Sequence, residues 1–360
     1  MKILRRYVFR ELIVPFVLSL LVLNFIFMGG YLMKAANFII GRGVSLQDSL
    51  YVLALALPGM VGYTVPTSIL MAVLLVFGNL SQNNELRAMK ASGIQLMNVL
   101  VPAFIMGLLL SAGMFVFNDQ VASNAQFELR RAMKKMVIKF PKALIEPGRF
   151  VNLSESIIFL AKEMKGDELR DIIAYEVGES HEPVRTIIAE RGEILSKEDA
   201  TEVQIRLYDG SVSDSQDEGV HSIQFKIYEF PTFGQEDIRK MKKKKRDFTL
   251  AEILIQLGNR SMTHAERREL WTAFHQRISF ACGSFVFVLI GIPFAVLVRR
   301  GEIVLSFAIA MAAASFYYIL FAGVKTISMQ GFLPPLVALW IPNVVLMALG
   351  IYFLRRAVVT

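Results

Sequence analysis

Histidine side chains are the first candidates for chemistry, because imidazole is both a common metal ligand and a general base. The sequence contains four histidines, and no two of them have the spacing that a metal site on one element requires. We therefore expect no metal site and no cofactor, and histidines that meet solvent or a partner. They are His181, His221, His264 and His275.

The long apolar runs of the chain carry no Asp, Glu, Lys or Arg near their middles. Transporters driven by protons or sodium usually place ionisable groups there, so the sequence argues against that class. It also offers no Asp pair and no Ser/His arrangement for proteolysis inside a membrane. An enzyme is the class that the sequence supports least.

One short motif resembles part of a nucleotide-binding loop. The stretch GVKT at 323–326 ends like a phosphate-binding loop, but Tyr318 stands where that motif requires glycine. The stretch also follows an apolar run rather than a strand. The chain thus shows no motif for hydrolysing ATP, and we expect it to be passive or driven by another subunit.

A polar stretch between two apolar runs is the candidate contact with such a subunit. Residues 83–94, NNELRAMKASGI, have the composition of a helix rather than of a flexible connector. On a helical wheel they form a small, weakly apolar face with one carboxylate, which suits a groove on a partner. From the residues alone, an equally good interpretation is an interfacial turn in which Arg87 and Lys90 reach lipid phosphates. The candidate face comprises Glu85, Leu86, Ala88, Met89, Ser92 and Gly93.

The apolar runs dominate the composition. The chain has 360 residues, 54% of them hydrophobic, and its mean hydropathy of +0.48 is typical of a protein with several membrane spans. Six runs are long enough to cross a bilayer, and we expect the first to be a retained span rather than a signal peptide. The single cysteine, Cys282, lies within one run, so no intramolecular disulfide can form. The runs are 12–33, 49–80, 91–118, 278–298, 303–324 and 333–354.

Basic residues in the short loops predict the orientation. One side of the membrane receives the basic start of the chain, the basic residues of 83–94, and the pairs that follow the fourth and sixth runs. The other side receives only Lys34, Arg42 and Lys325 in its short loops. Both termini and the 83–94 stretch are therefore expected in the cytoplasm. The net charge of +8 is explained by basic residues on the cytoplasmic side of the membrane, so we expect no nucleic-acid partner.

A polar insertion, residues 119–277, separates the first three runs from the last three and is expected outside. It begins as a helical extension of the third span and ends with two helices that start at Thr-x-x-Glu capping boxes. Between them, at about 142–233, apolar and polar residues alternate, which predicts a small antiparallel β-sandwich or open roll. Two of its strands show the alternation of half-buried strands, in which one face is buried. The apolar residues of that face are Val203, Ile205, Leu207 and Ile223, Phe225, Ile227.

Several stretches resemble one known family. They are RYVFRE before the first run, PTSILMAVLLVFGNL leading into ELRAMKASGI, and HQRISFACGSFVFVLIGIPFAVLVRRG at 275–301. With the three-plus-three layout around a β domain, they make the chain similar to the permeases of the lipopolysaccharide-export ABC transporter, the LptF/LptG family. The expected fold is an α-helical polytopic membrane protein of six transmembrane helices with an inserted, jellyroll-like antiparallel β domain. The expected domains are 1–118, 119–277 and 278–360.

The resemblance implies a non-catalytic subunit in the inner membrane of a Gram-negative bacterium. Its partners would be a second permease of this type, a cytoplasmic ABC ATPase dimer, a periplasmic bridge protein with a β-jellyroll, and lipopolysaccharide extracted from the outer leaflet. The stretch near 82–94 would be the coupling helix seated in the ATPase, with Glu85 at the family's acidic position. F-type and G-type subunits share this layout, so either type remains open, as does a homodimer.

Four cations are candidate ligands for lipid phosphates. Lys34 lies on the expected outer side, where short loops carry few charges, so an anionic ligand would explain it. Ordinary headgroup contact explains it nearly as well. The resemblance places Lys34 where the family is thought to meet lipid A phosphates. Arg42, Arg130 and Arg131 are weaker candidates, because basic helix faces are usually solvated.

Two other functions compete with export. A signalling or scaffold protein would also use an exterior β domain and a cytoplasmic helix, but it needs no path for a lipid. A permease of the lipoprotein-release type is disfavoured, because such proteins usually have four spans with the large exterior domain after the first.

Overall fold

The computed structural model describes most of the chain in two compact units. The helical unit comprises Met1–Gly30, Leu55–Phe127 and Lys243–Thr360, and the sheet unit comprises Tyr31–Ala54 and Glu128–Lys242. The described residues are 2–42, 44–139, 147–152, 157–166, 168–177, 183–196, 202–214, 221–230, 233–234, 238–239, 241–259, 262–298 and 303–359.

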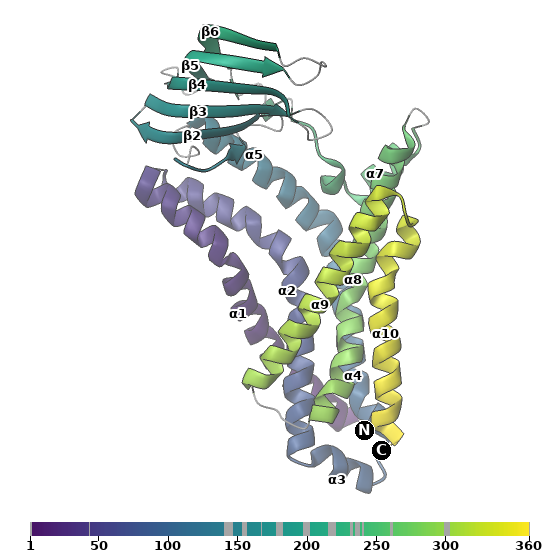
Figure 1. Ribbon diagram of the computed structural model, residues 1–360. Helices are drawn as coiled ribbons and strands as arrows, with labels where there is room; N and C mark the ends of the chain where they lie inside the picture. The colour runs from purple at the N-terminus through teal and green to yellow at the C-terminus, as the bar shows by residue number, and fades with distance from the viewer. Residues whose placement is uncertain are drawn as a thin grey trace. The chain divides into compact units, whose positions relative to one another are not determined.

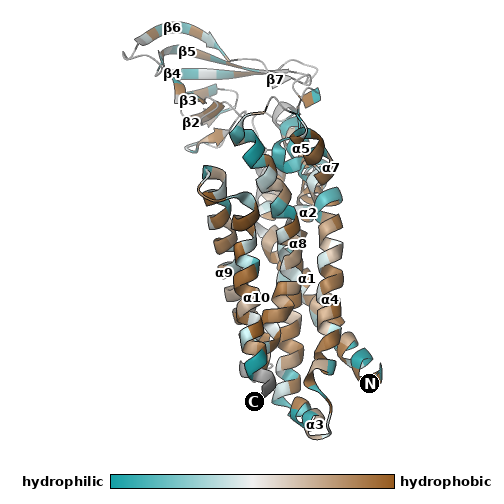
Figure 2. Cartoon of the chain, turned by 90° about the vertical axis from the view of Figure 1, so that its right-hand side faces the viewer, coloured by the Kyte–Doolittle hydropathy of each residue, from teal (hydrophilic) through white to brown (hydrophobic). Residues whose placement is uncertain are grey.

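Six helices among the described residues are long and apolar enough to cross a membrane, three before and three after the sheet, which confirms the predicted layout. Apolar residues cover the middles of these helices and polar residues gather at their ends (Figure 2). Helix α2 has 37 residues, which at 1.5 Å per residue gives a rod of about 55 Å, well beyond the ~30 Å hydrocarbon core. The helices are α1 (Lys2–Arg42), α2 (Leu46–Gln82), α4 (Leu96–Val116), α8 (His264–Val298), α9 (Ile303–Gln330) and α10 (Pro335–Val359).

The core of the helical unit is built mainly from α2, α4, α8 and α9, with contributions from α1 and α10. Long apolar stretches of α2 and α8 are buried there, for example Ile69, Phe77 and Phe287. Gly291 of α8 lets α2 approach closely, because a Cβ at this position would lie 2.8 Å from a methyl carbon of Leu70. Small residues at helix crossings are how membrane helices gain packing contacts.

Helix α4 continues without a break into the insertion. A π-helical segment, η1 (Phe117–Ala122), joins it to α5 (Ser123–Lys139), as the predicted helical extension requires. After the sheet the chain forms η3 (Lys245–Asp247) and α7 (Leu250–Leu257) before entering α8. Thr249 caps α7 through a reciprocal bond pair with Glu252, which confirms the first predicted capping box.

The sheet unit contains an antiparallel sheet whose described strands follow one another as a meander (Figure 1). The path runs β1-β2-β3-β4-β5-β6, and β7 pairs with one end of β5. The predicted antiparallel β domain is confirmed, and the described strands follow the hairpin order of an open roll. The strands are β1 (Val151–Asn152), β2 (Ile157–Lys165), β3 (Glu168–Val177), β4 (Pro183–Ser196), β5 (Glu202–Asp214), β6 (His221–Glu229) and β7 (Phe233–Gly234).

The sheet is creased along one row of residues. The paired ladder skips Lys162, Asp171, Glu190, Asp209 and Lys226, which lie opposite one another across β2 to β6. Asp171 and Asp209 have left-handed backbones, with φ of 49° and 52°. Asp tolerates this conformation better than most residues. We infer that these two residues create the crease.

The crease reverses which residues face the core. In β3 both Leu169 and Ile172 are buried, although they lie three positions apart and strict alternation would separate them. Ile205 and Leu207 are buried as predicted. In β6 the prediction is confirmed for Phe225, which packs against the core, and is wrong for Ile223 and Ile227, which are 69% and 59% exposed. Ile227 follows the crease and lies on the outer face, and the side chain of Val203 is outside the described residues.

Candidate functional site

The predicted docking stretch forms a separate short helix, α3 (Glu85–Ala91), between α2 and α4. It lies at the same end of the helical unit as both termini (Figure 1). Arg5 near the start of α1 donates to Asn98 Oδ1 near the start of α4, at 2.8 Å, so the first and third spans are joined at this end. The predicted grouping of α3 with the two termini is thus seen in the fold.

Turn geometry fixes both ends of α3. Asn84, with φ of 56°, makes the sharp entry from α2, and its side-chain oxygen accepts a bond from Arg87 at 3.3 Å. At the other end the Gly93 amide donates to Lys90 O and the Ile94 amide to Met89 O, at 3.1 and 3.0 Å. This pair of bonds is a Schellman motif, and Gly93 supplies its left-handed residue with φ of 78°. Such caps hold a short helix in one direction relative to the spans.

The two sides of α3 have different environments. Leu86 is only 7% exposed and belongs to the core of the helical unit, and Met89 packs against the same core. Ala88, Ser92 and Gly93 are exposed, and Glu85 is half-buried. Leu86 therefore faces the chain's own bundle, which differs from its predicted place on a partner-facing surface. A helical wheel cannot identify the side of a helix that meets its own protein.

The four predicted lipid-phosphate ligands all lie on helices. Lys34 and Arg42 lie in α1, and their side chains are outside the described residues. Arg130 and Arg131 lie in α5 and are half-buried. Arg131 donates to Glu128 at 3.0 Å, so part of its charge is balanced within its own helix.

At the end of the helical unit opposite α3, a buried ion pair joins the third and fourth spans. Arg277 of α8 donates to Asp119 Oδ1 of η1 at 2.7 Å, and the two side chains are only 9% and 11% exposed. The same carboxylate oxygen accepts the Leu250 amide at the start of α7, at 2.6 Å. Arg277 also donates to the carbonyl of Arg246 at 3.1 Å. One buried pair thus holds three segments of the fold together.

The basic run that returns from the sheet is anchored to the helical unit. Lys243 donates to Glu252 at 2.8 Å and to Asn124 at 3.2 Å. Lys245 pairs with Glu269 of α8. These bonds lie next to the Asp119–Arg277 pair and fix residues 243–250 against η1 and α8. Lys240 is outside the described residues.

The sequence analysis gave no role in the fold or in a site to three residues of this end. Asp119 and Arg277 lie 158 positions apart, and both were counted as the edges of the insertion. Lys325 was assigned to a loop because the apolar run ends at Val324, whereas α9 continues to Gln330. Lys325 could have been found in the same way as Lys34, because both are basic residues on the expected outer side, where short loops carry few charges.

Comparison with known proteins places the chain in a family. The profile of the family described as lipopolysaccharide export system permease LptF/LptG matches residues 6–356. An uncharacterized protein of Rickettsia prowazekii (strain Madrid E) is 19% identical over 140 residues. That similarity covers 39% of this chain and 39% of the relative's length. Because the family match spans nearly the whole sequence, the chain belongs to the LptF/LptG permease family.

Proposed function

We propose that this chain is a permease subunit of an ATP-driven transporter that extracts lipopolysaccharide from the inner membrane. Family membership supports the substrate, and six membrane-length helices support a multi-pass place in that membrane. The chain does no ATP chemistry in this proposal. A separate cytoplasmic ABC ATPase dimer supplies the energy, and a second permease completes the path.

The observation that carries the proposal is the geometry of α3. It presents exposed Ala88 and Ser92 beside Glu85, while Leu86 and Met89 anchor the opposite side in the chain's own core. Because a sharp turn at Asn84 and the Schellman motif at Gly93 fix the direction of α3, a push on the exposed side passes into α2 and α4. We assign Glu85, Ala88, Ser92 and the neighbouring backbone of Gly93 to the ATPase contact, and Leu86 and Met89 to anchoring.

The remaining parts have proposed roles in the same transporter. Exposed apolar residues of α1, such as Val14, Leu18 and Phe25, give the first span a surface for lipid or the second permease. Residues 119–277 form the proposed periplasmic part, between the membrane parts 1–118 and 278–360. Among the described strands β6 ends the path of the sheet, and it is the edge that we propose for strand addition by a bridge protein. Both termini are proposed to be cytoplasmic, at the α3 end.

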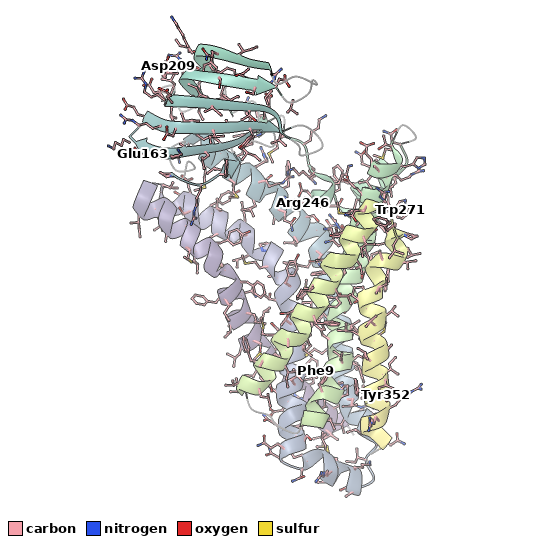
Figure 3. All side chains as sticks on the ribbon, viewed as in Figure 1. Phe9, Glu163, Asp209, Arg246, Trp271 and Tyr352 are labelled. Atoms are coloured by element: carbon pink, nitrogen blue, oxygen red, sulfur yellow. The ribbon has the colours of Figure 1, made fainter. Side chains whose placement is uncertain are left out.

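The test is charge reversal on the exposed side of α3. Glu85→Lys should reduce co-purification of the ATPase by roughly ten-fold or more and stop export, because reversing a charge in a docked interface costs several kcal/mol. Glu163→Lys reverses an exposed charge on the sheet and serves as the matched control (Figure 3).

Normal export together with normal ATPase association in Glu85→Lys would refute the coupling assignment. A chain that purifies without glycolipid, although its ATPase is bound, would favour the sensor or scaffold alternative.

A further inference from the structure

Helix α7 is apolar on both of its sides. Its inner side packs against α8, where Ile253 is fully buried together with Leu270. Its outer side carries two exposed apolar side chains, Leu254 and Ile255, and Ile255 is 75% exposed. Figure 2 accordingly shows α7 as a hydrophobic helix. A helix that is apolar all round is normally covered on every side, so the outer side of α7 is expected to meet something other than water.

The only charged side chain of α7 is neutralised within the chain. Glu252 accepts two bonds from the Lys243 ammonium, at 2.8 and 3.1 Å, and one from the Thr249 amide at 2.7 Å. The other seven residues of α7 carry no charge. The helix therefore brings no uncompensated charge to its surroundings, which suits contact with an apolar phase.

The start of α10 marks one edge of the hydrocarbon layer. The membrane-length part of this helix, Pro335–Arg356, has 22 residues. At 1.5 Å per residue it is about 33 Å long, close to the ~30 Å thickness of the hydrocarbon core. Because the basic pair Arg355 and Arg356 closes one end of this span, Pro335 lies at the boundary on the other side.

Helix α7 lies level with that boundary. Thr272 of α8 places its hydroxyl oxygen 3.4 Å from that of Ser328, in the last turn of α9. Helix α10 begins at Pro335, directly after the turn that follows α9. The part of α8 around Thr272 is therefore beside the start of the α10 span, and α7 packs on this part through Leu270.

Aromatic side chains are exposed at the same level. Trp271 of α8, labelled in Figure 3, is exposed, and its ring meets that of Phe274 edge to face with centroids 5.5 Å apart. Phe274 in turn packs against the buried side of α7. Phe332, in the turn between α9 and α10, is also exposed. Aromatic residues, above all tryptophan, concentrate at membrane interfaces. The outer side of α7 thus continues the lipid-facing surface of the spans.

We propose that α7 is an interfacial anchor, whose outer side lies between the headgroups and the acyl chains of the lipid leaflet at this end. Leu254 and Ile255 contact the apolar part of that leaflet, because the outer side of the helix offers no charge to a headgroup. The inference rests on the proposed function only in assigning this end to the periplasmic leaflet.

Anchoring α7 would also hold the chain that returns from the sheet. The Leu250 amide donates to the buried carboxylate of Asp119, and Lys243 pairs with Glu252. These bonds join the first turn of α7 to η1 and to residues 243–250. A membrane contact on α7 therefore restrains this segment at the surface of the bilayer.

Spin labelling measures the depth of α7. A nitroxide is attached to Ile255→Cys in a full-length Cys282→Ala chain, which is assembled with its partner subunits in vesicles of phosphatidylethanolamine and phosphatidylglycerol. Its collisions are measured with oxygen, which concentrates in lipid, and with a nickel chelate, which stays in water. Leu336→Cys, at the start of α10, is the reference for the lipid boundary, and Glu163→Cys, on the sheet, is the reference for water. Because Ile255 is exposed, its replacement leaves the core intact.

The ratio of oxygen to nickel collisions at Ile255 should exceed that at Glu163 by about ten-fold and match that at Leu336, because the label lies in the lipid boundary. Leu254→Glu in the labelled chain should lower the ratio about three-fold, because a carboxylate draws the outer side toward water. Gln224→Glu, which adds the same charge at an exposed position on the sheet, should not change it.

A ratio at Ile255 equal to that at Glu163 would place the outer side of α7 in water and overturn the proposal. Few collisions with either reagent would show that a protein covers this side, which would overturn it in favour of a subunit contact. The assay needs no export, so failure of the proposed transport function leaves the measured depth unchanged. A Leu336 label that reports water would refute the membrane placement of the spans and the anchor with it.

Discussion

The two ends of the helical unit are built by different means. At the α3 end, a left-handed turn at Asn84 and a Schellman motif at Gly93 hold a short helix whose outer side is exposed. At the opposite end, the buried Asp119–Arg277 pair holds the walls of a cation-lined pocket. Backbone turns leave the outer side chains of a short helix exposed, whereas a buried ion pair orders the charged side chains around it. The difference teaches that one bundle fixes its two ends by backbone geometry at one end and by buried charge at the other.

The largest effect on stability is expected from removing the Asp119–Arg277 ion pair, because this pair distinguishes one end of the helical unit from the other. Asp119→Ala leaves the guanidinium of Arg277 buried without its partner, which typically costs about 3–5 kcal/mol. We expect a large drop in the thermal unfolding midpoint of the detergent-solubilised complex. Glu128→Ala, which removes an exposed partner of Arg131, is the matched control and should change the midpoint little. Equal midpoints for the two variants would show that the pair is not structural.

A smaller effect is expected on the anchored side of α3. Leu86→Ala empties a buried site in the core and should destabilise the chain by about 2–5 kcal/mol. Arg87→Ala, on the exposed side of the same helix, should leave the midpoint unchanged. If Leu86→Ala lost ATPase binding at full thermal stability, the assignment of the two sides of α3 would be reversed.

The smallest effect concerns pH at the start of α7. Burial alone would raise the pKa of Glu252, but bonds from the Lys243 ammonium and Thr249 outweigh it and hold the pKa below its ordinary value. A carboxyl with a lowered pKa stabilises the fold above its unfolded pKa, about 4.3, and this contribution is lost as pH falls through the folded pKa. The side chain is 38% exposed, so solvent weakens the effect.

We therefore compare the unfolding midpoints of the unmodified chain and of Glu252→Gln between pH 7 and about pH 3, a range that extends below the unfolded pKa of a glutamate. The difference between them should be small at pH 7 and should shrink further as the pH falls below about 4.3. A difference that stays constant over this range would show that the Glu252 charge adds nothing to stability.

Much of the fold was predictable because its signals are local. Each span is an uninterrupted apolar run, and the capping box at Thr249 needs only four neighbouring residues. The site was harder, because its parts are distant in sequence. Asp119 and Arg277 meet across 158 positions, and only the folded bundle reveals that pairing.

Two local predictions failed for physical reasons. Period-2 alternation misplaced Ile227, because the crease at Lys226 reverses the faces of the strand. The rule that a span ends at the first charge misplaced Lys325, because a helix can carry a lysine that faces a pocket. The two left-handed residues, Asp171 and Asp209, were a visible warning, since Asp is unusual inside strands.

The most direct test of the central claim is photo-crosslinking from the exposed side of α3. A benzophenone residue at Ala88, in native membranes, should capture an ABC-type ATPase that mass spectrometry can identify. The same probe at Glu163 on the sheet should capture none. If Ala88 captures only lipid while the ATPase is shown to be present, α3 is an interfacial turn, and the account of this chain as the driven half of a lipid pump is wrong.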